Sequence, residues 1–69
     1  MSARNKLSKR IVEAVNQMPT KVRRVFILSH YRGVSLRAIA ETFGIQEREA
    51  ESLLRRGNTL FYRTLSPVS

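Results

Sequence analysis

The sequence predicts an all-α fold, a small four-helix domain, and three observations support this prediction. Apolar residues recur every three or four positions in four separate segments, which is the pattern of helices with one buried face. Proline, glycine and serine stand between these segments, where helices begin and end. No stretch shows the alternation of apolar and polar residues that is typical of a half-buried strand. A length of 69 residues suffices for one domain, so we expect a single domain over residues 1–69 with an ordered core at about residues 6–64.

The composition excludes several classes of function. The chain has no cysteine, and its single histidine and five carboxylates show no metal-ligand spacing. It has no nucleophile–base set and no phosphate-binding loop, so we expect no enzyme activity, no cofactor, no metal and no small-molecule ligand. The longest apolar run has four residues, and no apolar signal core follows the basic N-terminus. We therefore expect a cytoplasmic protein with no membrane partner.

The first half of the chain predicts two helices. The first is expected over residues 6–17 and stops before Pro19, which lacks the N–H group of a continuing helix. The second is expected from residue 19 or 20 to residue 31, and Gly33 then takes a positive φ. Residues 1–5 and 66–69 have no apolar periodicity and are expected to fray. The inward positions are Leu7, Ile11, Val15 and Met18 in the first helix and Val22, Val25, Phe26 and Leu28 in the second.

The second half predicts a C-terminal helix-turn-helix over residues 35–63. Ser35 is a favourable N-cap for a helix of about two turns, which Gly44 closes. Ala40 lets the two helix backbones approach, and Ile45 fills the crevice after the turn. The fourth helix is expected from about residue 46 to 63, with apolar positions at Ala50, Leu53, Leu54, Gly57, Leu60 and Phe61. The alternative is an ordinary helical hairpin in a small bundle.

The net charge of +8 indicates a nucleic acid or an acidic protein surface as partner, against the alternative of a merely soluble basic surface. Most of this charge lies in residues 1–24, which carry +6. The outward stripe of the fourth helix consists of Arg48, Ser52, Arg55 and Thr59. Arginine can hold guanine through two hydrogen bonds, so this stripe is a candidate for reading double-stranded DNA.

The acids of the fourth helix favour a different interpretation, a solvated face with salt bridges such as Glu51–Arg55. Glu47, Glu49 and Glu51 oppose phosphates, although they suit the helix dipole and can accept a hydrogen bond from cytosine. We expect His30 to be structural or solvated. The candidate phosphate contacts, whose alternative role is solubility, are Lys21, Arg23, Arg24, Ser35, Arg37, Arg56 and Thr59.

Several segments in order resemble region 4 of bacterial RNA polymerase sigma factors, with the extracytoplasmic-function type the most similar. They are the run from Met18 to Leu28, then Gly33-Val-Ser, Ala38-Ile-Ala and Phe43-Gly-Ile, within a similarity over about residues 7–63. The resemblance implies recognition of the minus-35 promoter element, contact with the polymerase β flap and, in many members, an anti-sigma factor. By position, the family's DNA-reading residues fall on Gln46, Glu47, Arg48, Glu49, Ser52, Arg55 and Arg56.

The chain departs from that family at four positions and in length. Ala38 replaces a usual glutamate, Gln46 a capping serine or threonine, Glu49 a small or apolar residue, and Gly57 an alanine. No promoter-melting region 2 is present, so the chain is an excised domain or a free-standing sigma-like protein, and Met1 favours the second. Two functions therefore stay open. One is a promoter-binding module, and the other is a protein-interaction module that contacts the β flap, a sigma factor or an anti-sigma factor, for example through residues 60–65.

Overall fold

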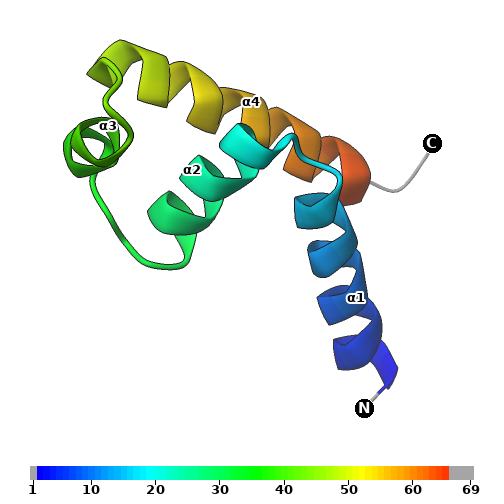
Figure 1. The fold of residues 1–69 in the computed structure, drawn as a ribbon. Coiled ribbons are helices and arrows are strands. Elements are labelled where there is room, and N and C mark those ends of the chain that lie inside the picture. Colours follow the sequence, from blue (N-terminus) through cyan, green and yellow to red (C-terminus); the bar gives the residue numbers. More distant parts are fainter. Residues whose placement is uncertain (1, 66–69) are drawn as a thin grey trace.

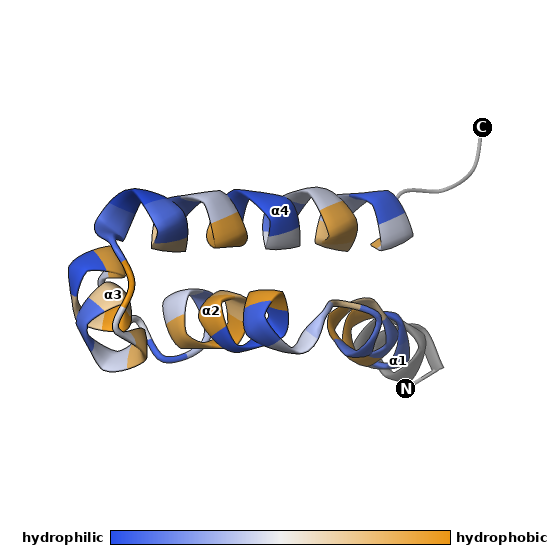
Figure 2. Cartoon of the chain, turned by 45° about the horizontal axis from the view of Figure 1, so that its top comes forward, coloured by the Kyte–Doolittle hydropathy of each residue, from blue (hydrophilic) through white to orange (hydrophobic). Residues whose placement is uncertain are grey.

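The computed structural model describes residues 2–65, with side chains from Lys9 onward. This part of the chain folds into α1 (Ser2–Asn16), α2 (Thr20–His30), α3 (Leu36–Phe43) and α4 (Glu47–Leu65), which confirms the all-α prediction. The long helix α4 lies on one side, and α3, α2 and α1 follow one another along its other side (Figures 1 and 2). Because α4 contacts each of the other three helices, it holds the domain together. None of the helices within residues 2–65 combines the length and hydropathy needed to cross a membrane.

Two helix boundaries differ from the sequence predictions. Helix α1 begins at Ser2, so residues 2–5 are helical and the prediction that they fray is wrong. Apolar periodicity does not detect this turn because helix-favouring residues such as Ala3 and Arg4 extend the helix by propensity alone. Helix α4 continues to Leu65, two residues beyond the expected end. The rest of the predicted frayed ends, residues 1 and 66–69, and the side chain of Leu7 lie outside the described part.

The core near the turn joins α2, α3 and α4. Its buried members are Val25, Ile39, Ala40 and Ala50. Ile45 packs against them from just after the turn, as expected of a residue that fills the crevice. Small side chains at Ala40 and Ala50 allow α3 and α4 to cross closely, and Figure 1 shows α3 end-on where α4 runs across the page. This cluster is the helix-turn-helix core, and it confirms the predicted register.

A second cluster, the C-terminal core, lies where α1 meets α2 and α4. Met18, Val22 and Phe26 are buried there, with Leu60 and Phe61 of α4 packed against them. Leu53 and Leu54 pack against both clusters and make the apolar interior continuous. On α1, Ala14 is fully buried whereas the predicted stripe residues Ile11 and Val15 are only half-buried, so the buried stripe is rotated from the predicted one.

Gly57 lies where α4 packs against α2. A Cβ atom at this position would lie 3.1 Å from Cδ1 of Phe26 and 3.2 Å from Cγ1 of Val22, both in buried side chains. The absence of a side chain therefore lets the two helix backbones come together. This is the physical reason for a glycine in the middle of a helix, where it otherwise costs about 1 kcal/mol relative to alanine.

Candidate nucleic-acid interface

The turn between α3 and α4 is held by backbone hydrogen bonds around Gly44. This glycine has φ 67° and ψ 34°, a left-handed conformation that side chains with a Cβ atom disfavour. Its N–H donates to the carbonyls of Ala40 and Glu41, and the N–H of Ile45 donates to the Ala40 carbonyl at 3.0 Å. This is the Schellman arrangement, which satisfies the last carbonyls of α3. The predicted turn is confirmed, and it sets the direction in which α4 leaves α3.

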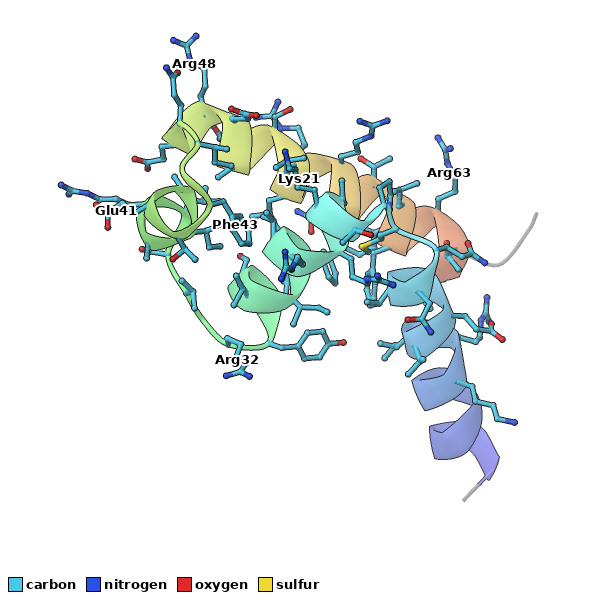
Figure 3. All side chains as sticks on the ribbon, in the orientation of Figure 1. Lys21, Arg32, Glu41, Phe43, Arg48 and Arg63 are labelled. Atoms are coloured by element: carbon cyan, nitrogen blue, oxygen red, sulfur yellow. The ribbon has the colours of Figure 1, made fainter. Side chains whose placement is uncertain are left out.

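The predicted outward stripe of α4 faces solvent along its whole length. Arg48, Ser52, Arg55 and Thr59 are all exposed. Figure 3 shows Arg48 extending from the N-terminal end of α4, away from the other helices. The stripe offers two guanidinium groups and a serine hydroxyl on one helix face, which are the donor types that contact base edges in a major groove.

Arg55 is not free in this stripe. Its Nη2 lies 3.5 Å from Oε2 of Glu51 one turn earlier, with both side chains largely exposed. The salt bridge suggested by the sequence is therefore present. It is the one ion pair found among the side chains of residues 9–65. The Thr59 hydroxyl donates to the Arg55 carbonyl at 3.1 Å. Of the stripe's two arginines, Arg48 is the one that forms no ion pair in the described residues.

The acids at the start of α4 lie where the helix dipole favours them. Glu47 and Glu49 occupy the first turn and are exposed. Their negative charge stabilises the positive end of the helix. The same charges lie beside Arg48 at the end of the helix that a DNA groove receives in helix-turn-helix proteins, so they reduce the attraction to phosphates at that end.

The start of α3 carries two further candidates. Ser35 is the N-cap, and its Oγ accepts a hydrogen bond from the N–H of Ala38 at 3.1 Å, as predicted. The hydroxyl hydrogen of a serine in this role stays available to a further acceptor. Arg37, two residues later, is exposed. Both groups lie at the positive end of a helix dipole, where anions are stabilised.

The cations of α2 do not share the stripe of α4. Lys21 and Arg24 are exposed, and Arg23 is half-buried. The guanidinium carbon of Arg24 lies 5.9 Å from the ring centre of Phe43 on α3. Arg24 thus faces the space between α2 and α3.

Comparison with known families decides what kind of helix-turn-helix this is. The model of the family "Sigma-70, region 4" matches residues 8–57. The chain belongs to this family. The search of curated proteins and the search of solved structures found no significant match. Domains of the sigma-70 region 4 family are non-enzymatic modules of sigma factors with a role in promoter recognition.

The match covers most of this region 4 domain and ends inside α4. It begins at the second turn of α1 and includes α2, α3, the turn and α4 as far as Gly57. The resemblance noted from separate short segments is therefore confirmed at the level of the family. The C-terminal turns of α4 lie outside the match, and there the structure shows contacts that the sequence did not indicate.

Two of these contacts join residues far apart in the chain. Nη2 of Arg10 donates to the carbonyls of Thr64 at 3.5 Å and Leu65 at 3.2 Å, which caps the C-terminus of α4 with a positive charge. Nε2 of His30 lies 2.8 Å from Oδ1 of Asn58, and its ring packs on Phe26 with centroids 4.4 Å apart. His30 is therefore a structural link between α2 and α4. No spacing pattern in the sequence identifies either contact.

Proposed function

We propose that this region 4 domain recognises the minus-35 element of a promoter in the cytoplasm, with the N-terminal half of α4 in the major groove of the duplex. The observation that carries the proposal is the exposed stripe of Arg48, Ser52 and Arg55 on a helix oriented by the Gly44 turn. Members of the sigma-70 region 4 family take part in promoter recognition, which supports this role. The base-contact candidates are Gln46, Glu47, Arg48, Glu49, Ser52 and Arg55.

The positions around the stripe suggest how the domain contacts the DNA backbone. Ser35 and Arg37 at the positive end of α3 are the best-placed phosphate contacts, because helix N-termini attract phosphates. Arg56 flanks the stripe on α4, Thr59 is its last member, and both are exposed. Lys21 and Arg23 on α2 stay proposed contacts to more distant phosphates. Glu47 and Glu49 reduce the non-specific attraction of the domain to DNA phosphates. Each can accept a hydrogen bond from a base that presents a donor in the major groove, such as cytosine.

A duplex-binding measurement tests this proposal. A fluorescent promoter duplex is titrated with the protein at several salt concentrations, and we expect affinity to fall linearly with salt on a logarithmic scale. Arg48→Ala is expected to weaken binding by about tenfold or more, which corresponds to the 1–3 kcal/mol of a bidentate base contact. Arg63→Ala is the matched control, because Arg63 lies on the same helix at its opposite end (Figure 3). Absence of duplex binding even at low salt contradicts the proposal.

A second surface supports a contact with RNA polymerase. Ile11, Val12, Val15 and Ile27 line an apolar hollow of about 300 Å³ between α1 and α2, which ends at Tyr31. Val12 and Tyr31 are 56% and 60% exposed, which is unusual for side chains of this size in a small domain. Tyr31 also borders an adjoining hollow of about 210 Å³ between α2 and α4. We propose that the β flap of the polymerase packs on this apolar surface, with an anti-sigma factor as a competitor for it.

The two contacts are separable by mutation. Val12→Glu is expected to abolish binding of a purified β-flap fragment while leaving duplex affinity unchanged, and Arg48→Ala is expected to do the reverse. If Val12→Glu abolishes flap binding and the native protein never binds duplex, the domain is a protein-interaction module that does not read DNA. In residues 60–65, Leu60 and Phe61 pack in the C-terminal core, so Tyr62, which is exposed on the border of the adjoining hollow, is the proposed protein contact of this segment.

A further inference from the structure

Phe43 divides a groove between α2 and α3 into two hollows. One hollow, of about 340 Å³, is lined by Thr20, Lys21, Arg24 and Phe43. The other, of about 290 Å³, is lined by Arg24, Ile27, Leu28, Arg32 and Phe43. Together they form the α2–α3 groove, in which Phe43 lies between the two helices, with Lys21 near the start of α2 and Arg32 just past its end (Figure 3). Each hollow exceeds the roughly 150 Å³ of a cavity that holds benzene, so each has room for a large side chain.

The groove combines an apolar floor with a basic rim. Phe43, Ile27 and Leu28 are half-buried and form the floor, whereas Lys21, Arg24 and Arg32 are exposed. No carboxylate is among the residues that line either hollow. In the described residues the three cations form no ion pair. The acid of α3, Glu41, stands two residues before Phe43 in the sequence, and its side chain points away from α2 (Figure 3). The rim therefore has unneutralised positive charge around an accessible aromatic ring.

We infer that the α2–α3 groove binds an acidic protein segment that places an aromatic or aliphatic side chain beside Phe43. The guanidinium carbon of Arg24 lies 5.9 Å from the centre of the Phe43 ring, so a carboxylate bound to Arg24 and an apolar side chain beside the ring occupy adjacent positions. A planar guanidinium group suits a carboxylate because it offers two parallel donors. This surface is separate from the proposed base-contact stripe, since Arg48, at the start of α4, points away from α2 and α3 (Figure 3). The base-contact stripe therefore stays free when this partner is bound, and Lys21, a proposed contact to more distant phosphates, is the residue that the two surfaces share.

The apolar floor favours protein over nucleic acid as the occupant. A duplex backbone satisfies the charges of Lys21 and Arg24 but leaves Phe43, Ile27 and Leu28 without a partner. A single-stranded base stacks on an aromatic ring but gains little from the aliphatic part of the floor. An amphipathic protein segment satisfies both parts of the groove, because its apolar face meets the floor and its carboxylates meet the rim.

The probe for this inference is a synthetic twelve-residue peptide with one phenylalanine, one leucine four positions later and five glutamates. It is titrated into the ¹⁵N-labelled full chain, and amide shifts are followed by NMR. We expect saturable shifts at Thr20, Arg24, Leu28 and Phe43, with those of Arg48 and Ser52 unchanged. Arg24→Glu is expected to weaken binding at least tenfold. Arg63→Glu, with the same change in net charge outside the groove, is expected to weaken it less than twofold at 0.1 M salt, because the Debye length is then about 10 Å.

Two matched peptides and two nucleic acids separate the outcomes. A peptide with glutamines for glutamates and one with alanine for phenylalanine are each expected to bind at least fivefold more weakly. Phe43→Leu keeps an apolar floor without the ring. It should lower the affinity for the original phenylalanine-containing peptide, while the amide spectrum of the variant remains that of a folded protein. Absence of shifts at the groove, or equal binding of the alanine peptide, overturns the inference. So does displacement of the peptide from the groove by a promoter duplex or by oligothymidylate, because the groove is then a nucleic-acid contact.

Discussion

Arg55 and Glu51 form an exposed ion pair one turn apart on α4, with 3.5 Å between Nη2 and Oε2. A phosphate or base that binds Arg55 must compete with this carboxylate. The pair itself contributes little to stability, about 0.3–0.5 kcal/mol for an exposed pair with this spacing. Its main consequence is therefore for binding, because Glu51 neutralises a cation in the stripe proposed to contact DNA.

Replacing Glu51 by glutamine is expected to strengthen duplex binding by about three- to tenfold at low salt. The substitution removes a negative charge near the phosphates and releases Arg55, so the slope of log affinity against log salt should steepen by about one. Fluorescence anisotropy at several salt concentrations measures both quantities. Glu13→Gln makes the same change in net charge on a different helix, α1. Equal gains from the two variants contradict a specific role for Glu51.

The N-cap of α3 allows folding and DNA contact to be tested separately. Ser35→Ala removes the hydrogen bond to the Ala38 N–H and is expected to lower the free energy of unfolding by about 1 kcal/mol. Ser35→Asp keeps a good N-cap, so urea denaturation should show native-like stability. If Ser35 lies beside a phosphate, the added negative charge weakens duplex binding by about tenfold. Unchanged duplex affinity in Ser35→Asp removes Ser35 from the proposed interface.

The helix-turn-helix is the part of the molecule that the sequence predicts best. Gly44 is a local signal, because a left-handed residue after a helix selects glycine. Ala40, Ala50 and the 3.6-residue period of α4 identify the inward face, so its opposite face and the stripe on it follow from geometry. The exposed stripe and the ion pair between its Arg55 and Glu51 were both predictable from the sequence, since residues four apart on a helix are neighbours.

Contacts between distant segments were not predictable in the same way. Arg10 and the carbonyls it caps are 54 and 55 residues apart in the chain, and His30 and Asn58 are 28 apart. Such pairs depend on the relative positions in which α1 and α2 pack against α4. Composition and periodicity carry no information on these positions. Phe43 shows the same limit, because it packs against the helix-turn-helix core and also lines the α2–α3 groove, and no spacing in the sequence indicates the groove.

Gly57 is expected to tolerate alanine poorly despite the gain in helix propensity. A Cβ atom there meets Phe26 at 3.1 Å and Val22 at 3.2 Å, so buried side chains have to shift. Overpacking of this kind costs about 1–3 kcal/mol, against a gain of about 1 kcal/mol from replacing glycine in a helix. We expect Gly57→Ala to destabilise the domain by about 1 kcal/mol and Gly57→Val by about 3 kcal/mol or more. Thermal denaturation by circular dichroism, with exposed Ser52→Ala as control, measures this. A more stable Gly57→Ala protein shows that α2 and α4 separate easily.

The start of α4 is expected to gain stability from a better N-cap. The N–H groups of Glu49 and Ala50 both donate to the backbone carbonyl of Gln46, which places Gln46 just before the helix. Glutamine is a weak N-cap, whereas a serine oxygen accepts a hydrogen bond from the second or third N–H of the helix. Glu49 stands three residues later, so Gln46→Ser creates the sequence of a capping box.

Gln46→Ser should therefore raise the free energy of unfolding by about 0.5–1 kcal/mol, as measured by urea denaturation. Gln46→Ala is the matched control and should give no gain. In the double variant with Glu49→Ala the reciprocal hydrogen bond of the capping box is lost, and part of the gain should disappear. If Gln46→Ser stabilises the domain yet weakens duplex binding severalfold, the native glutamine is retained for contact with DNA at the expense of helix stability. If stability and duplex affinity both rise, Gln46 has no such contact, and the proposed base contacts begin at Glu47.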